Sequence, residues 1–233
     1  MTEEIKIRPI ARIETDLPDK FGVPRQSGLV SGLRGRIVFE PEYRSPEAVR
    51  GLEGFTHIWL IWYLSRTDQG GKWSPTVRPP RLGGNTRMGV FATRSTYRPN
   101  PIALSSVALE GIESDEKLGP VLIVRGADLL DGTPIIDIKP YIPAYDSHPE
   151  ASGGFTDAYM GYALEVDIPD DMLAAVPEDR REALRGVLAN DPRPSYQDDP
   201  ERVYGMRFAG LEVKFRVSGS KLTVVSIGPD ENQ

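Results

Sequence analysis

Glycine and proline interrupt the first 140 residues of this chain at short intervals. The chain has 233 residues, of which 23 are glycine and 21 are proline. Glycine and proline favour turns, and the segments between them are rich in β-branched and aromatic residues with little helical periodicity. Many short strands joined by turns favour an antiparallel β-barrel or sandwich.

The clearest predicted strand is the run from Thr56 to Leu64. It is almost wholly apolar and rich in aromatic and branched side chains, so we expect a strand buried on both faces. His57, within it, is interpreted as a core histidine with satisfied hydrogen bonds rather than as a base. A short helix over residues 46–52 would have Ser45 as its N-cap. Further strands are predicted at residues 5–13, 35–39, 88–92, 105–112, 121–127 and 135–138.

The pattern changes after about residue 165. Residues 177–190 carry apolar side chains at near-helical spacing, which predicts a helix. Residues 210–217 and 221–227 alternate and are joined by Ser218-Gly219-Ser220, which predicts a hairpin. We therefore expect a mainly β protein with one domain at residues 1–165 and a small α+β domain, a helix plus a hairpin, at residues 166–233.

Composition excludes several classes of site. The chain has no cysteine, which excludes disulfides, thiolate metal sites and cysteine nucleophiles, and its two histidines argue against a multi-histidine metal site. We expect no metal. No apolar run is long enough to cross a bilayer, and the acidic start Met1-Thr2-Glu3-Glu4 lacks the features of a secretion signal. These observations predict a cytoplasmic protein without a membrane span.

Positive charge is concentrated in one stretch, although the net charge is −6. Because charges act over only about 10 Å at moderate salt, one local basic surface can bind phosphate on an acidic protein. The alternative is a solvated arginine-rich loop. The stretch has a single acid, Asp68, and its basic residues are Arg66, Lys72, Arg78, Arg81, Arg87, Arg94 and Arg98.

Four segments carry more specific features than a plain barrel needs, while the common nucleotide-binding and hydrolase motifs are absent. In these segments prolines stiffen the chain, glycines allow close approach of the backbone to a ligand, and arginines suit phosphate or carboxylate. Tyr97 could stack on an RNA base or pack at the barrel rim. Asp128 could accept hydrogen bonds from a ligand, whereas Asp131 could simply form a turn. The segments are residues 20–29, 77–85, 91–101 and 126–141.

These segments together resemble the TsaA-like family, whose best-described members are the tRNA N6-threonylcarbamoyladenosine methyltransferases called TrmO. The matching stretches are long and in the same order, and LANDPRPSY with the final strand pair extends the likeness to the C-terminal part. The four principal stretches are KFGVPRQSGL, AVRGLEGFTHIWLIW, VRPPRLGGNTRMGVFATRSTYRPNPIALSSV and GADLLDGTPIIDIKPYIPAYDS.

The resemblance implies a single-sheeted antiparallel β-barrel that binds S-adenosylmethionine, forms a homodimer and N6-methylates threonylcarbamoyladenosine at position 37 of the tRNA anticodon loop. Ser27 stands where many members have proline, and Ala103 where many have glycine. Both are small, so we expect cofactor binding to be retained. The implied cofactor contacts are Gln26, Ser27, Gly28, Arg66, Thr67, Arg94, Leu104, Arg125, Gly126, Ala127 and Asp128.

Methyl transfer to N6 requires that the nitrogen lose its proton to water or to a nearby carboxylate. Asp131 and Asp137 are the candidate bases, and Tyr141 could orient the base. Two alternatives remain, namely a non-enzymatic RNA-binding barrel and a methyltransferase with another substrate. The residues expected to hold RNA phosphates or the substrate carboxylate are Arg78, Arg81, Arg87, Arg98 and Lys139.

Overall fold

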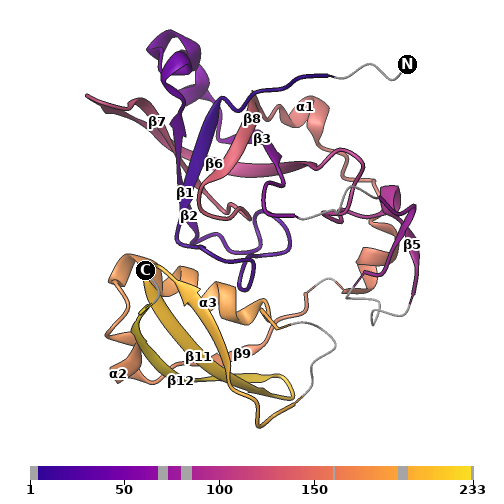
Figure 1. Cartoon of the computed structure of the whole chain (residues 1–233), viewed down its shortest axis with the longest axis vertical. Coiled ribbons are helices and arrows are strands. Elements are labelled where there is room, and N and C mark those ends of the chain that lie inside the picture. Colours follow the sequence, from indigo (N-terminus) through magenta and orange to yellow (C-terminus); the bar gives the residue numbers. More distant parts are fainter. Residues whose placement is uncertain (1–4, 68–72, 80–85, 160, 194–198, 232–233) are drawn as a thin grey trace.

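A closed antiparallel barrel forms the first part of the molecule (Figure 1). The computed structural model describes residues 5–67, 73–79, 86–159, 161–193 and 199–231. The barrel contains six strands in the order β1-β2-β7-β6-β3-β8, and every pair is antiparallel. The predicted mainly β, barrel-type fold is confirmed. The strands are β1 (Ala11–Thr15), β2 (Arg34–Phe39), β3 (His57–Tyr63), β6 (Ile102–Asp115), β7 (Gly119–Arg125) and β8 (Thr133–Pro140).

Alternate side chains of these strands fill the barrel interior, as the two-residue period of a strand requires. Ile13 and Ile37 face each other across β1 and β2, and both are fully buried. Ile58 and Leu60 of β3 join the same cluster with Val107 of β6.

Two expectations about β3 are wrong. Only one of its faces is buried, because an antiparallel barrel covers the inner face of each strand and leaves the outer face to solvent. His57 therefore lies exposed on the outside and is not a core residue. Its Nδ1 lies 3.0 Å from Oγ1 of Thr56, and its ring is 6.2 Å from the ring of Tyr141.

Other predicted elements are shorter than expected. The first strand begins at Ala11 rather than at residue 5. The strand predicted over residues 88–92 is β5 (Met88–Gly89), which pairs with β4 (Thr76–Val77) and runs into the 3-10 turn η5 (Val90–Ala92). The helix predicted at 46–52 is the 3-10 helix η2 (Pro46–Val49), and Ser45 makes no side-chain cap. The remaining short elements are η1 (Pro41–Tyr43), η3 (Leu52–Gly54), α1 (Pro143–Asp146), η6 (Gly154–Tyr159), α2 (Asp170–Leu173) and η7 (Glu178–Arg180).

A four-stranded sheet in the order β10-β11-β12-β9 forms the C-terminal part together with α2, η7 and the longer helix α3. The predicted hairpin is β11 and β12, and the apolar face of α3 is buried in the same core as the sheet. Strands β9 and β10 were not predicted, because β9 has only three residues and β10 carries Gly205 and Arg207 among its apolar side chains. The elements are β9 (Glu165–Asp167), β10 (Tyr204–Phe208), α3 (Arg181–Ala189), β11 (Leu211–Ser218) and β12 (Lys221–Pro229).

The connection between β1 and β2 lies between the barrel and this sheet (Figure 1). Three of its apolar side chains, Leu17, Val30 and Leu33, belong to the core of the C-terminal part rather than to the barrel core. The two cores are therefore joined by a segment that is covalently part of the barrel.

Candidate functional site

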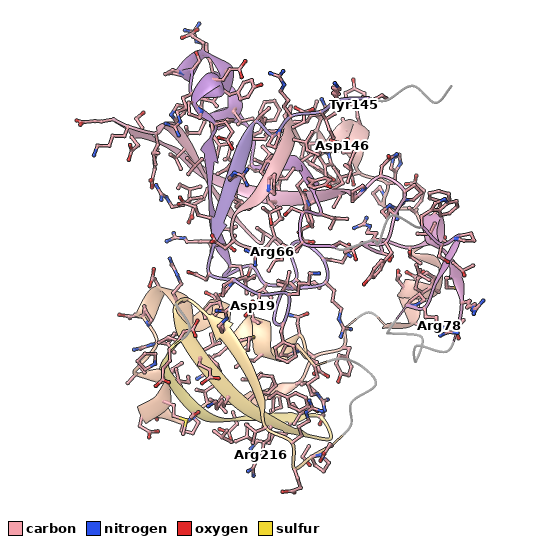
Figure 2. The ribbon with its side chains drawn as sticks, viewed as in Figure 1. Asp19, Arg66, Arg78, Tyr145, Asp146 and Arg216 are labelled. Carbon is pink, nitrogen blue, oxygen red and sulfur yellow. The ribbon has the colours of Figure 1, made fainter. Side chains whose placement is uncertain are left out.

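A cavity of about 660 Å³ is lined in part by Arg66, which Figure 2 shows at the end of the barrel that faces the C-terminal sheet. Its volume lies in the range typical of small-molecule sites. Five stretches far apart in the sequence line it, so the barrel topology brings their side chains together. The lining residues fall within 20–26, 61–67, 93–98, 102–104 and 128–133.

A chain of hydrogen bonds ends on a carboxylate in the cavity wall. Nε1 of Trp62 donates to Oγ of Ser105 at 3.0 Å, and this hydroxyl donates to Oδ1 of Asp128 at 2.6 Å. Ser105 is only 2% exposed. Burial raises the pKa of Asp128, while the Ser105 bond and the positive charge of Arg94 partly oppose that rise. The carboxylate is thus oriented by the barrel wall and faces a partly desolvated space.

Arg94 joins two of the cavity-lining stretches. Its guanidinium donates to Oε1 of Gln26, and both side chains line the cavity. The arginine also lies close enough to Asp128 to influence the pKa of that carboxyl. The cavity therefore contains a cation, an amide and a carboxylate as neighbours.

Arg66 lies at the end of the barrel that faces the C-terminal sheet (Figure 2). It donates from Nη1 to the carbonyl of Pro18 at 2.8 Å and from Nη2 to that of Asp131 at 3.4 Å. Arg66 and Thr67, which the resemblance implies as cofactor contacts, both line the cavity.

Gly28 and Gly126 contact each other next to the cavity-lining stretches 20–26 and 128–133. The amide of Gly28 donates to the carbonyl of Gly126 at 2.9 Å, and a Cβ on Gly126 would lie 3.3 Å from backbone atoms of Gly28. Both have positive φ, which favours glycine. The backbone of Ser27 forms a hydrogen bond with the carboxylate of Asp128. Ala127 is buried in the barrel core, and the side chain of Arg125 donates to the carbonyl of Ser31.

Of the predicted cofactor residues, Gln26, Arg66, Thr67, Arg94, Leu104 and Asp128 line the cavity. Ser27, Gly28, Arg125, Gly126 and Ala127 are not among the residues that line it; the contacts above tie them to the stretches that do.

None of the three candidate catalytic residues lines this cavity. Asp131 accepts a hydrogen bond from the amide of Thr15 and so fixes a turn against β1. Asp137 pairs with Lys139 at 2.8 Å. The ring of Tyr141 packs 5.4 Å from that of Trp59. Asp131 and Asp137 adjoin cavity-lining residues, since the Asp131 carbonyl accepts from Arg66 and Asp137 is the strand partner of Ile61, but none of the three candidate side chains lines the cavity.

The predicted RNA contacts are distributed over several places. Arg78 and Arg87 are exposed on the arm formed by β4 and β5, and Figure 2 shows Arg78 far from Arg66. Arg98 donates to the carbonyls of Val90 and Thr93, which favours a role in shaping its own loop. Arg81 lies outside the described residues.

Exposed aromatic rings accompany these arginines. Phe91 is 72% exposed and lies 6.3 Å from the ring of Trp73. Tyr97 is 57% exposed, which does not fit a packed residue at the barrel rim.

The sequence reasoning missed Trp62 and Ser105. Both lie on predicted strands, at residues 56–64 and 105–112. A serine and an indole on strands of a barrel are polar groups that need hydrogen-bond partners when they are buried, and this requirement could have marked both as residues of a polar site.

Within the part of the chain that the structure describes, no helix is long and apolar enough to cross a membrane.

Comparison with known proteins gives matches over both parts of the chain. The model of the tRNA-methyltransferase O N-terminal domain matches residues 12–147, and that of the TrmO C-terminal domain matches residues 162–230. The tRNA (adenine(37)-N6)-methyltransferase of Escherichia coli is 41% identical over 230 residues, covering 94% of this chain and 96% of that protein.

A sequence relative and a solved structure from Pseudomonas aeruginosa are also similar. A putative S-adenosylmethionine-dependent methyltransferase is 41% identical over 214 residues and covers 89% of this chain and 90% of its own length. The crystal structure of TrmO superimposes with a TM-score of 0.80 at 32% identity and covers 99% of each chain.

Proposed function

The chain belongs to the tRNA-methyltransferase O family, and on this premise we propose that it transfers a methyl group from S-adenosylmethionine to N6 of adenine 37 in tRNA. The substrate form we propose is threonylcarbamoyladenosine in the anticodon loop. A tRNA substrate also supports a cytoplasmic location. The observation that carries the proposal is the cavity at the barrel end, where stretches from the matched family domain converge.

The residues of the cavity fit this cofactor. S-adenosylmethionine carries a carboxylate, an ammonium group, hydroxyls and a cationic sulfonium. Arg66 and Arg94 are suited to the carboxylate, because guanidinium groups bind carboxylates in a bidentate fork. Asp128 is suited to the ammonium or a ribose hydroxyl, and the apolar wall at Leu104 and Ile61 to the adenine.

When bound, the cofactor supplies a methyl group activated by its sulfonium. The chain's residues bind and orient, which is a large part of such catalysis. Trp62 and Ser105 hold the Asp128 carboxylate in one direction. The N6 proton must leave to water or a carboxylate, and Asp131, Asp137 and Tyr141 stay predictions for that role without support from the cavity geometry.

We propose that RNA approaches along the arm that carries Arg78 and Arg87. Arginine binds phosphate, and exposed rings such as Phe91 can stack on unpaired bases. An anticodon-loop base is already unpaired, so presenting it to the cavity costs little. Arg81, Arg98 and Lys139 remain predictions for contacts to the phosphates or to the threonylcarbamoyl carboxylate.

We propose that two copies pair through the outer face of β3 and β6. Tyr63 and Ile102 are paired neighbours on that face, 42% and 38% exposed, and Leu104 is 52% exposed. A monomer seldom leaves such adjacent apolar side chains to solvent. Because Tyr63, Ile102 and Leu104 also line the cavity, a second copy seated there would complete its wall.

Mass spectrometry of nucleosides from tRNA incubated with the protein and S-adenosylmethionine tests the proposal. The expected product is N6-methylated threonylcarbamoyladenosine, formed only when the cofactor is present. A methylated product on a different nucleoside would favour another substrate. If the protein bound tRNA but no cofactor, the non-enzymatic RNA-binding alternative would hold.

A further inference from the structure

The connection between β1 and β2 has two faces with different neighbours. We call residues 16–33 the first pocket loop. On one side its residues 20 and 23–26 line the cavity, and on the other its apolar side chains pack into the core of the C-terminal sheet. The side chains on this second face are Leu17, Phe21, Val23, Val30 and Leu33.

The apolar contacts on the second face are close. The ring of Phe21 stacks on that of Phe215 in β11, with centroids 6.3 Å apart. Gly22 has φ +98°, and an added Cβ there would overlap the side chain of Met206 in β10. A Cβ on Gly32 would lie 2.9 Å from the backbone nitrogen of Ala183. A side chain at Gly32 would therefore push the loop away from α3, whereas one at Gly22 would displace the Met206 side chain and strain the left-handed backbone.

Two ion pairs connect the start of the first pocket loop to the C-terminal part. The guanidinium of Arg207 in β10 binds both carboxylate oxygens of Asp19, at 2.5 and 2.7 Å. That hydrogen bonding lowers the pKa of Asp19. Arg180 pairs with Asp16 at 2.6 Å, and the amide of Ala209 donates to the Asp16 carbonyl at 3.0 Å.

A side chain of the barrel part also binds the start of the first pocket loop. Arg66, which lines the cavity, donates to the carbonyl of Pro18, the residue before Asp19. Figure 2 shows Arg66 and Asp19 near each other where the barrel meets the C-terminal sheet. Residues 18–19 are thus held between Arg66, which binds the carbonyl of Pro18, and Arg207, which binds the carboxylate of Asp19.

We infer that the C-terminal sheet positions the cofactor pocket, with Arg207 acting as a positioning residue through Asp19 and the first pocket loop. The C-terminal part contributes no residue to the cavity lining among the described residues. Its influence on cofactor binding therefore runs through the placement of Gln26 and Arg66. This inference rests on the proposal that the cavity binds S-adenosylmethionine.

The test measures the dissociation constant of S-adenosylmethionine by calorimetry for three variants: Arg207→Met, Asp19→Asn and their combination. Loss of this partly exposed pair should weaken binding about three- to tenfold. Arg207→Met also removes the contact of Arg207 with Asp230, so it should be the weaker of the two single variants. The double variant should bind as Arg207→Met does, because Asp19→Asn then removes nothing further from the Arg207–Asp19 pair. Arg216→Met is the matched control, since Arg216 lies at the end of the C-terminal sheet far from the barrel (Figure 2), and its affinity should equal that of the wild type.

Amide hydrogen exchange distinguishes positioning from general loss of stability. Arg207→Met should accelerate exchange in residues 16–33 and leave β7 unchanged. Unchanged affinity and exchange in this variant, or an equal effect of Arg216→Met, would overturn the inference while leaving the proposed function intact. A wild-type protein that binds no S-adenosylmethionine would overturn the proposed function, and this inference with it.

Discussion

Replacing Ser105 by alanine removes the middle of the hydrogen-bond chain that orients Asp128. The Ser105 hydroxyl is 2% exposed, accepts from Trp62 at 3.0 Å and donates to Asp128 at 2.6 Å. A hydrogen bond to a charged group contributes about 1.5–3 kcal/mol, and leaving the indole N–H without its partner adds to the loss. We expect Ser105→Ala to lower the free energy of unfolding by about 2–4 kcal/mol.

Urea denaturation followed by tryptophan fluorescence measures this change. In a thermal melt, the melting temperature should fall by roughly 5–15 °C, as expected for a chain of this size. Ser114→Ala, at an exposed position of the same strand, is the control and should change stability by less than about 0.5 kcal/mol. If Ser105→Ala were no more destabilising than Ser114→Ala, the hydrogen-bond chain would contribute nothing and the account of Asp128 would be wrong.

Three further predictions concern the ligands and the assembly. Burial raises the pKa of Asp128, so the affinity for a cationic cofactor should begin to fall on acidification at a higher pH than it would with an exposed aspartate. This pH dependence should vanish in Asp128→Asn. If calorimetry gave Asp128→Asn the same pH profile as the wild type, the prediction would be wrong. Leu104→Asp should turn a dimer into a monomer by light scattering, and a persisting dimer would exclude this face. Arg78→Ala should weaken tRNA binding and reduce its salt dependence by about one unit of slope in filter binding, whereas an unchanged slope would remove Arg78 from the RNA contact.

The sequence predicted the barrel because antiparallel strands have a local signature. The two-residue alternation and the glycine and proline turns act within a few residues, and β2, β7 and β8 lie close to their predicted ranges. The prediction failed where burial depends on the closed barrel. His57 sits among apolar neighbours in the sequence, yet it lies on the outer face of β3.

Part of the candidate site was predictable through the resemblance, and part was not. The resemblance implied cavity residues such as Gln26, Arg94 and Asp128, which lie far apart in the sequence and meet in the cavity. Asp131 is a candidate base as a carboxylate of the segment 126–141, but its carboxylate accepts from the backbone amide of Thr15. A hydrogen-bond partner more than a hundred residues away cannot be identified from the residues on either side of Asp131 in the sequence.

The packing of the first pocket loop on the C-terminal sheet also had no signal in the sequence. Leu17 and Val30 look like ordinary apolar residues in a loop. Their role depends on a core whose buried members outside this loop come from residues 164–224. Sequence patterns report which residues are buried, but they do not tell which of two cores a loop residue joins.

Calorimetric titration of S-adenosylmethionine into wild-type protein and Arg94→Ala tests the central claim most directly. Because Arg94 contacts Gln26 and lies near Asp128 inside the cavity, its removal should weaken binding at least about tenfold while the fold is retained. Equal affinity of the two proteins for S-adenosylmethionine would mean that the cofactor does not bind in the barrel cavity.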